Sequence, residues 1–273
     1  MKNIIKLEFI KTLGYPAFRA IIILHAVLFL LVVTIGSQIE LSFQGVRVDK
    51  LFSFPHVWAT FSWIGSWFNL LLGILAIILV GNEHQYRMFR KQIIDGVSRK
   101  QLLVGKISII LASSLYAMIL VFASSLLFGI IYTDNLSLSL IFSNIHLVLV
   151  LFIQAFAYMM LGMLFAFIFK NNALSIVSFI LFFFPGEPII RAFFPSSIDM
   201  FFPIKIISNL TPMPDFVGIT AGDLIQINGV SPSMQSMGLL PDSLSVGIAT
   251  LVCIIYIGIF YFASRMIIER RNF

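Results

Sequence analysis

The sequence predicts an all-α integral membrane protein with six transmembrane helices. Hydrophobic residues occupy 59% of its 273 positions, charged residues occupy only 11%, and the mean hydropathy is +1.02. A water-soluble domain carries about 25% charged residues and could not bury this much apolar surface. Apolar runs long enough to cross a bilayer recur along the chain. These observations exclude a soluble enzyme, a nucleic-acid-binding domain and a disordered protein.

A spanning helix needs about 20 mostly apolar residues. Six segments qualify as candidates: residues 17–35, 60–80, 107–132, 145–169, 173–185 and 244–267. The fifth begins at Ala173 and reaches the break at Phe182, Phe183, Phe184 and Pro185, where the proline is expected to interrupt the helix. Only residues 170–172 separate the fourth and fifth segments, so these two are expected to form a tight helical hairpin.

Three non-spanning segments belong to the same transmembrane domain, which we assign to residues 1–273. Residues 1–16 alternate apolar and basic side chains and are expected to form an amphipathic helix in the inner membrane interface. Residues 81–106 form the most charged loop. Residues 185–242 hold 8 of the 10 prolines, which predicts short broken helices on the outer side before the last span.

The distribution of charge predicts the orientation. With both termini in the cytoplasm, the inner segments carry 14 of the 18 basic residues and only 4 of the 12 acidic ones. The positive-inside rule favours this arrangement, and six spans also require both termini to share a side. We therefore expect a multi-pass protein of the plasma membrane, which in a bacterium is the inner membrane.

No catalytic constellation is present in the sequence. It has no zinc-protease motif, no G-x-S-x-G motif and no group of residues with metal-ligand spacing, so neither a catalytic residue nor a metal site is predicted. Gly105-Lys106 lacks the upstream glycine and the following Ser or Thr of an ATP-binding loop. The chain is therefore expected to hold no cofactor, and any ATPase that drives it must be another polypeptide.

Two features inside or beside the spans allow two interpretations each. His25 lies about midway along the first span, where it either packs against a neighbouring helix or marks a path for substrate or protons. Glu187 and Arg191 lie four residues apart just beyond the fifth span, so a helix would place them side by side. They form either a structural ion pair or a gate at the outer mouth.

The loop over residues 81–106 is predicted to form a short amphipathic helix, a turn and a second helix. Glu83 and Arg87 are spaced as i, i+4, as are Arg87 and Lys91, while Ile94 belongs to an apolar edge. Arg90 adds a further basic group. A short helix of this kind can dock into a groove on a partner protein, or it can lie as a solvated basic loop on anionic lipid.

The end of this short helix and the start of the next are also indicated. Asp95-Gly96 is typical of a helix stop, and Ser98 is a good N-cap for a helix beginning at Arg99.

The loop and the overall plan resemble permeases of the ABC type-2 transporter family. The matching residues are Glu83, Gly96, Ser98, Arg99 and Lys106. The resemblance also covers the N-terminal interface helix, the six spans, the short fourth-to-fifth turn and the broken outer helices. It implies that residues 87–97 form the coupling helix, which docks on a separate ATP-binding-cassette subunit.

The resemblance implies a permease subunit of an ABC transporter, with export as the expected direction of transport. A path lined largely by Phe, Leu and Ile suits an amphipathic or hydrophobic substrate. ATP and Mg²⁺ would be bound by the partner ATPase, and a second permease copy, identical or paralogous, would complete the path within membrane lipid. One alternative is a component of an envelope assembly, motility or secretion machine that carries no classical cargo. A secondary transporter is the third interpretation, which the absence of acidic residues within the spans disfavours.

Overall fold

The computed structural model describes residues 2–38, 48–216, 219, 234 and 244–270, and these ranges contain helices and turns but no strand. Six helical segments are long and apolar enough to cross a membrane. They are α2 (Pro16–Ser37), α3 (Val57–Gln85), α5 (Arg99–Tyr132), the run from α6 (Leu138–Phe142) through α7 (His146–Phe169), the run from α8 (Asn172–Leu181) to α9 (Glu187–Arg191), and α13 (Val246–Arg270). The predicted all-α fold with six spans is therefore confirmed.

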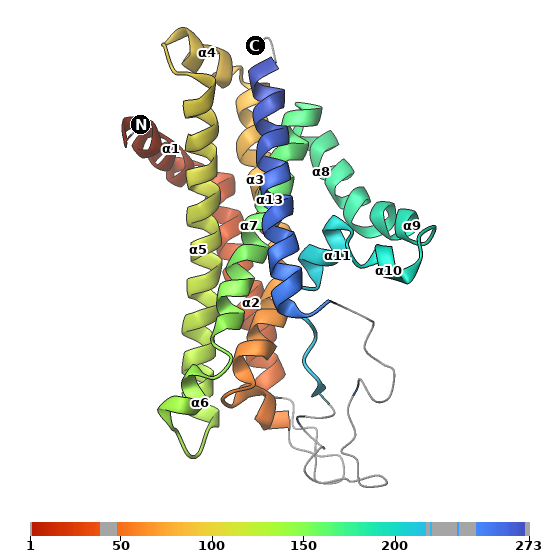
Figure 1. Ribbon diagram of the computed structural model, residues 1–273. Helices are drawn as coiled ribbons and strands as arrows, with labels where there is room; N and C mark the ends of the chain where they lie inside the picture. Colours follow the sequence, from red (N-terminus) through yellow and green to blue (C-terminus); the bar gives the residue numbers. More distant parts are fainter. Residues whose placement is uncertain (1, 39–47, 217–218, 220–233, 235–243, 271–273) are drawn as a thin grey trace.

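Helices α3 and α7 form the centre of the bundle. The spanning window that contains α7 is 67% buried and that of α3 is 56% buried, whereas α2, the α8–α9 run and α13 bury only 17% each. Figure 1 shows the long helices side by side, with α8 diverging from the bundle toward α9. The core therefore lies along the α3–α7 contact, and the outer helices present most of their apolar side chains to the surroundings.

Two glycines allow α3 and α7 to approach closely. A Cβ atom added at Gly162 would lie 2.3 Å from the backbone oxygen of Gly73, and one added at Gly73 would lie 3.3 Å from the backbone oxygen of Tyr158. Small residues at helix contacts permit this approach in membrane proteins, where packing replaces the hydrophobic effect as the source of association.

Substituting Gly162→Ala is expected to destabilise the protein by roughly 1–3 kcal/mol, because the new methyl group would overlap backbone atoms that cannot rotate away. Unfolding in mixed micelles of mild detergent and denaturant measures the difference. Gly258→Ala in α13 is the matched control, since nothing lies within 4 Å of its added Cβ atom. Equal stability of the two variants would contradict the close packing of α3 on α7.

The expected N-terminal helix forms as α1 (Lys2–Gly14). Leu7, Ile10 and Leu13 are exposed on it, whereas Glu8 and Thr12 are buried against the bundle. Glu8 and Thr12 therefore face the bundle, while these three apolar side chains face outward, as suits a helix that borders lipid. Its position in the membrane interface stays a prediction.

The helix was expected to be interrupted at Pro185, and this prediction is wrong. The chain passes through residues 182–186 as one π-helical turn, η2 (Phe182–Gly186), with Pro185 inside it, and continues directly into α9. A π turn widens the helix by one residue, which lets it accommodate a proline that has no N–H to donate. The fifth span is consequently longer than predicted.

The short outer helices predicted before the last span are present as α10 (Ser196–Asp199) and α11 (Pro203–Ser208). Gln154 of α7 holds α11 in place: its Nε2 donates to the Ile207 carbonyl at 2.8 Å and to Thr211 Oγ1 at 3.1 Å. Asn69 of α3 donates to Gln154 Oε1 at 3.1 Å. This buried network satisfies the backbone that the broken helices would otherwise leave unpaired at membrane depth.

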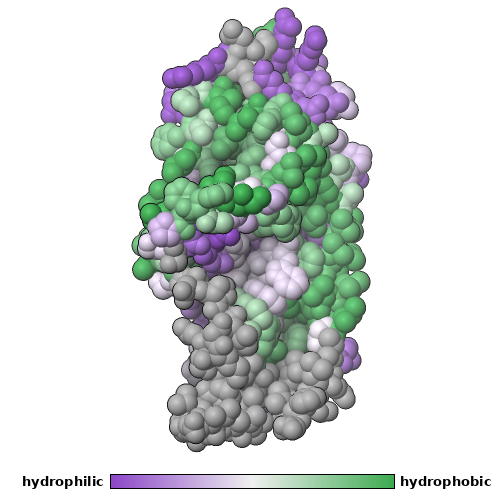
Figure 2. Space-filling view, turned by 90° about the vertical axis from the view of Figure 1, so that its right-hand side faces the viewer, coloured by the Kyte–Doolittle hydropathy of each residue, from purple (hydrophilic) through white to green (hydrophobic). Residues whose placement is uncertain are grey.

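One end of the bundle is strongly polar. Figure 2 shows hydrophilic side chains gathered at the end that carries the loop between α3 and α5, above a largely hydrophobic surface. The beginning of α1 and the end of α13 lie at the same end in Figure 1. A short 3₁₀ helix, η1 (Val48–Phe52), and α6 lie at the opposite end.

Candidate functional site: the loop end of the bundle

Helix α4 (Met88–Ile94) forms the tip of this end, between α3 and α5 (Figure 1). It is separated from α3 by a turn in which Arg87 adopts a left-handed conformation, with φ of +54°. The predicted helical pair of Glu83 with Arg87 is therefore wrong, because α3 ends at Gln85 and the two side chains do not share one helix. Glu83 pairs with lysines from other helices instead.

The predicted helix stop and helix start are both confirmed. Gly96 has φ of +89°, which favours glycine, and Val97 N donates to the Gln92 carbonyl at 2.9 Å, closing the end of α4. Ser98 Oγ accepts a hydrogen bond from Gln101 N at 3.3 Å, and Ser98 N donates to Gln101 Oε1 at 2.9 Å. This reciprocal capping box fixes the start of α5 at Arg99.

One aromatic side chain anchors α4 to the bundle. Phe89 is 1% exposed, and its ring centroid lies 4.7 Å from that of His84 in α3 and 6.1 Å from that of Phe167 in α7. This contact joins α4 to the ends of the two central helices.

The remaining face of α4 is open. Its exposed side chains are Arg87, Met88, Arg90, Lys91 and Ile94, and we call this set the basic–apolar surface. Ile94 is 75% exposed, which is unusual for an isoleucine in an aqueous setting. A small surface that combines apolar and basic side chains is suited to insertion into an acidic or apolar groove of a partner protein.

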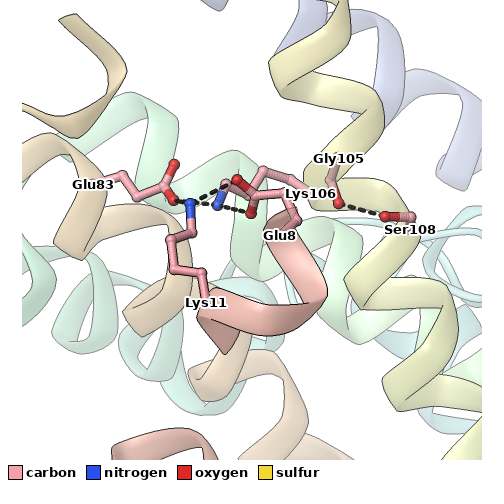
Figure 3. Close-up of polar contacts among 6 residues, drawn as sticks. All are labelled: Glu8, Lys11, Glu83, Gly105, Lys106 and Ser108. Atoms are coloured by element: carbon pink, nitrogen blue, oxygen red, sulfur yellow. Dashed lines mark hydrogen bonds and ion pairs between the residues drawn. The ribbon is translucent and has the colours of Figure 1, made fainter. Parts of the chain in front are cut away.

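Below α4, two acidic and two basic side chains form what we call the charge cluster: Glu8, Lys11, Glu83 and Lys106 (Figure 3). Lys106 Nζ lies 2.5 Å from Glu8 Oε2 and also contacts Glu83 Oε1. Lys11 Nζ lies 2.6 Å from Glu8 Oε1 and contacts the same oxygen of Glu83. The cluster ties together α1, α3 and α5.

The cluster is buried, which determines how its charges behave. Glu8 is 2% exposed, and Glu83 and Lys106 are 4% exposed each. Burial alone would raise the pKa of Glu8, but the ammonium groups of Lys106 and Lys11 outweigh it, so the pKa lies below its ordinary value. Burial alone would lower the pKa of Lys11, but the carboxylates of Glu83 and Glu8 hold it above its ordinary value.

These two shifts predict the pH range in which α1 stays attached. The lowered pKa of Glu8 gives stability that is present above its ordinary value of 4.5 and lost as the pH falls through the lower folded value. The raised pKa of Lys11 gives stability that is present below 10.5 and lost only above that value. Hydrogen exchange of α1 amides, corrected for intrinsic rates, is therefore expected to change little between about pH 6 and 8 and to increase at about pH 4 or below. Exchange in α1 that is equally fast at neutral and acid pH would contradict this.

The structure changes the assignment of two predicted docking residues. Glu83 cannot contact a partner directly, because the cluster buries it. Arg99 is half-buried, and its Nη1 donates to the backbone carbonyls of Ile268, at 3.1 Å, and Glu269 near the end of α13. Gly96 ends α4 and Ser98 caps α5, so both residues determine the path of the backbone. Of the predicted set, Arg87, Arg90, Lys91 and Ile94 remain available to a partner.

A second polar network, which sequence reasoning missed, crosses the same end of the bundle. Asn82 Nδ2 donates to Tyr15 Oη, and Asn172 Nδ2 donates to Asn82 Oδ1 at 2.5 Å. Gly81 makes room for it, since a Cβ atom there would lie 1.8 Å from Asn172 Oδ1. The network joins the α1–α2 junction, α3 and the start of α8. The sequence signal for this network is the presence of Asn82 and Asn172 at the ends of two predicted spans.

His25 is buried in the bundle, as the simpler of its two interpretations requires. Its Nδ1 lies 3.5 Å from Tyr116 Oη, which donates to the Ile22 carbonyl at 2.9 Å, and the ring of Phe68 packs edge-on at 6.4 Å. These contacts describe a packed polar residue between α2, α3 and α5. A role in a substrate path stays a prediction.

Glu187 and Arg191 lie in α9 as the spacing indicated, but their separation is 3.9 Å. Glu187 is 1% exposed, and its carboxylate accepts hydrogen bonds from the backbone N–H groups of Ile204, at 2.7 Å, and Lys205, at 2.8 Å. Its main partner is therefore the N-terminus of α11. The structure gives the pair a positioning role, and the outer gate stays a prediction.

Within the residues that the structure describes, no group of three or more His, Cys, Asp or Glu side chains could hold a metal ion. Cys253, the single cysteine, is buried in α13. The loop end of the bundle combines the exposed basic–apolar surface with polar networks that join the helices beneath it.

Comparison with known families identifies the architecture. A family model described as ABC-2 family transporter protein matches residues 4–186, which is about two thirds of the chain. The chain belongs to this family. The match runs from α1 to the π turn and contains α4 and all four residues of the charge cluster. No curated protein matches the chain.

As an ABC-2 family member, the protein is a membrane component of a transporter. Such components generally lack an ATPase site of their own and partner with an ATPase subunit. The resemblance seen in Glu83, Gly96, Ser98, Arg99 and Lys106 is thereby confirmed at the level of the family. The ABC-2 match also agrees with six membrane-spanning helices in the described part of the chain.

Proposed function

We propose that this chain is the permease subunit of an ABC exporter and that a separate ATPase docks on the basic–apolar surface of α4. The observation that carries the proposal is the exposure of Arg90, Lys91 and Ile94 on a helix that Phe89 anchors to the bundle. ATP and Mg²⁺ would be bound by the partner, since the sequence has no phosphate-binding loop.

The contacts beneath α4 support a route by which movement of the ATPase reaches the spans. Helix α4 is joined to α3 through a two-residue turn and to α5 through Gly96 and the capped Ser98. The charge cluster then links α3 and α5 to α1. We expect a push on α4 to tilt the ends of these helices together, since the buried ion pairs oppose their separation.

A partly exposed apolar stripe on α3 supports a second permease copy. Trp67 is 57% exposed, and at helical spacing from it lie four half-buried side chains: Trp63, Leu70, Ile74 and Ile78. Both α2 and α8 contact α3, so the three spans can together border a path between two copies. The aromatic and aliphatic character of this face suits an amphipathic or hydrophobic cargo, and the copies would be identical or paralogous.

The charge distribution supports the orientation that we propose. Helix α4, the beginning of α1 and the end of α13 share one end of the bundle, and the segments assigned to that end hold 14 of the 18 basic residues. Both termini would then lie in the cytoplasm, with the protein in the plasma membrane or bacterial inner membrane.

Co-purification tests the partnership. A tagged chain extracted in mild detergent is expected to bring down a polypeptide that carries an ATP-binding cassette, and ATP turnover of the complex is expected to exceed that of the chain alone. Recovery of the chain without any ATPase would contradict the proposal. Transport of labelled lipids, peptides and drugs into proteoliposomes then distinguishes an exporter from a component of an envelope assembly.

A further inference from the structure

An apolar groove with a volume of about 260 Å³ lies between α1, α2 and α5. Almost all of its accessible wall is apolar, although hydroxyl-bearing side chains also border it. An apolar cavity of about 150 Å³ stays free of water and binds benzene, so a groove of this size and character favours hydrocarbon over water. The wall includes Leu13 of α1, Phe18 and Ile22 of α2, and Ile109, Ala112 and Tyr116 of α5.

The groove runs along the two spans, away from the end of the bundle that carries α4. Both α2 and α5 extend from that end toward the opposite one (Figure 1). From Ile109 to Tyr116 the wall extends for about 10 Å along α5. Tyr116 Oη donates to the Ile22 carbonyl at 2.9 Å, which joins α5 to α2 at the deeper end of the groove. Leu13, at the other end, is 57% exposed. A hydrocarbon chain can therefore enter beside α1 and lie along the spans.

One cationic side chain lies at the end of the groove nearest to α1. Arg19 follows Phe18 in α2 and is exposed, and its Nη2 donates to the carbonyl of Gly14 at 2.9 Å. Gly14 itself follows Leu13, so this hydrogen bond holds the guanidinium beside two residues of the wall. A guanidinium has five N–H donors in a geometry that matches phosphate, and the Gly14 carbonyl occupies one of them.

We propose that the groove holds one acyl chain of a phospholipid, whose phosphate accepts hydrogen bonds from Arg19. An apolar wall that ends at one cation matches a molecule with a hydrocarbon chain and an anionic group at its end. Exposed Leu7, Ile10 and Leu13 on α1 place this cation near the level of the lipid headgroups. Neither the groove nor Arg19 involves α4, so lipid binding here is independent of ATPase docking.

A chain in this position contacts all three helices that border the groove. It therefore adds apolar contacts between α1 and the bundle, in addition to the ion pairs of the charge cluster. Hydrogen exchange of α1 amides is expected to slow roughly tenfold when lipid-stripped protein is reloaded at about ten times the dissociation constant, since a bound lipid stabilises the state that binds it.

Native mass spectrometry of the full chain tests the proposal. The chain is purified in mild detergent, stripped of lipid and titrated with phosphatidylglycerol, whose headgroup carries no ammonium beside the phosphate. The wild-type chain is expected to bind one phospholipid more tightly than the rest. Ala112→Phe places a phenyl group in the groove and is expected to weaken this binding by about tenfold or more. Ala123→Phe makes the same change at an exposed position of α5 outside the groove and is expected to keep it.

Arg19→Gln tests the phosphate contact without filling the groove, and because Arg19 is exposed it also provides a test if Ala112→Phe does not fold. It is expected to weaken the tight binding about fivefold, whereas Lys100→Gln, which removes an exposed charge from α5, is expected to leave it unchanged. A wild-type chain without a tightly bound phospholipid, or equal binding by Ala112→Phe and Ala123→Phe, would overturn the proposal. Equal binding by Arg19→Gln and Lys100→Gln would show that the phosphate does not contact Arg19.

Discussion

Replacing Lys106→Met is expected to lower the free energy of unfolding by about 3 kcal/mol or more, the largest stability effect that we expect of a single substitution in this protein. Lys106 is 4% exposed and contacts both Glu8 and Glu83. Without it, two buried carboxylates would share the single ammonium of Lys11. The loss is measured by denaturant unfolding in detergent, together with hydrogen exchange of α1, which is expected to detach first.

The matched control is Lys100→Met, which makes the same change at an exposed position of the same helix. The double variant Glu83→Gln/Lys106→Met is expected to lose less stability than the sum of its single variants, because each removes a charge that the other leaves unpaired. Equal stability of Lys106→Met and Lys100→Met would show that the charge cluster does not hold α1 to the bundle.

Replacing Arg90→Glu and Ile94→Asp together is expected to reduce ATPase association at least tenfold while leaving the folded bundle intact. Both side chains are exposed, and neither belongs to the charge cluster or to the Phe89 contact. The double change reverses one charge and places another in the apolar part of the basic–apolar surface, which strongly weakens an interface centred there. Co-purification and stimulated ATP turnover provide two independent readouts.

Leu138→Asp supplies the control for this surface. Leu138 is 73% exposed in α6, at the opposite end of the bundle, so the substitution introduces the same carboxylate at similar exposure. It is expected to leave ATPase association unchanged. If the α4 double variant still associates normally with the ATPase, α4 is not part of the docking site.

The features that the sequence predicts correctly depend on local signals. The six spans follow from runs of apolar residues, and the end of α4 follows from Gly96, whose positive φ favours a residue without Cβ. Ser98 caps α5 through Gln101, three residues away. Each of these signals involves residues that are close together in the sequence. They can therefore be predicted from one sequence without knowing how the helices pack.

The charge cluster could not be predicted in the same way. Lys11 and Glu83 are 72 positions apart, and Glu8 and Lys106 are 98 apart, so only the packing of α1 on α5 and α3 brings them together. The sequence alone places Glu8 and Lys11 in the interface helix and Glu83 and Lys106 in the charged loop. Glu8 and Lys11, spaced i, i+3 on the polar face of a predicted amphipathic helix, were the available signal.

The outer helices show a related limit. A proline in a span predicts an interruption, but whether the chain breaks or widens into a π turn depends on what packs around it. Glu187 likewise looked like the partner of Arg191 from their spacing alone. In the fold it accepts hydrogen bonds from two backbone N–H groups of α11, which lies 17 and 18 residues further along the chain.

Site-specific photo-crosslinking from position 94 tests the docking of an ATPase on α4 most directly. A photoreactive amino acid is placed at position 94, and a second chain carries it at position 138 as the control at the opposite end of the bundle. In membranes that contain the complete transporter, position 94 is expected to give a crosslink to the ATP-binding-cassette subunit, and position 138 none. A crosslink from position 138 alone, or none from position 94, would contradict the account.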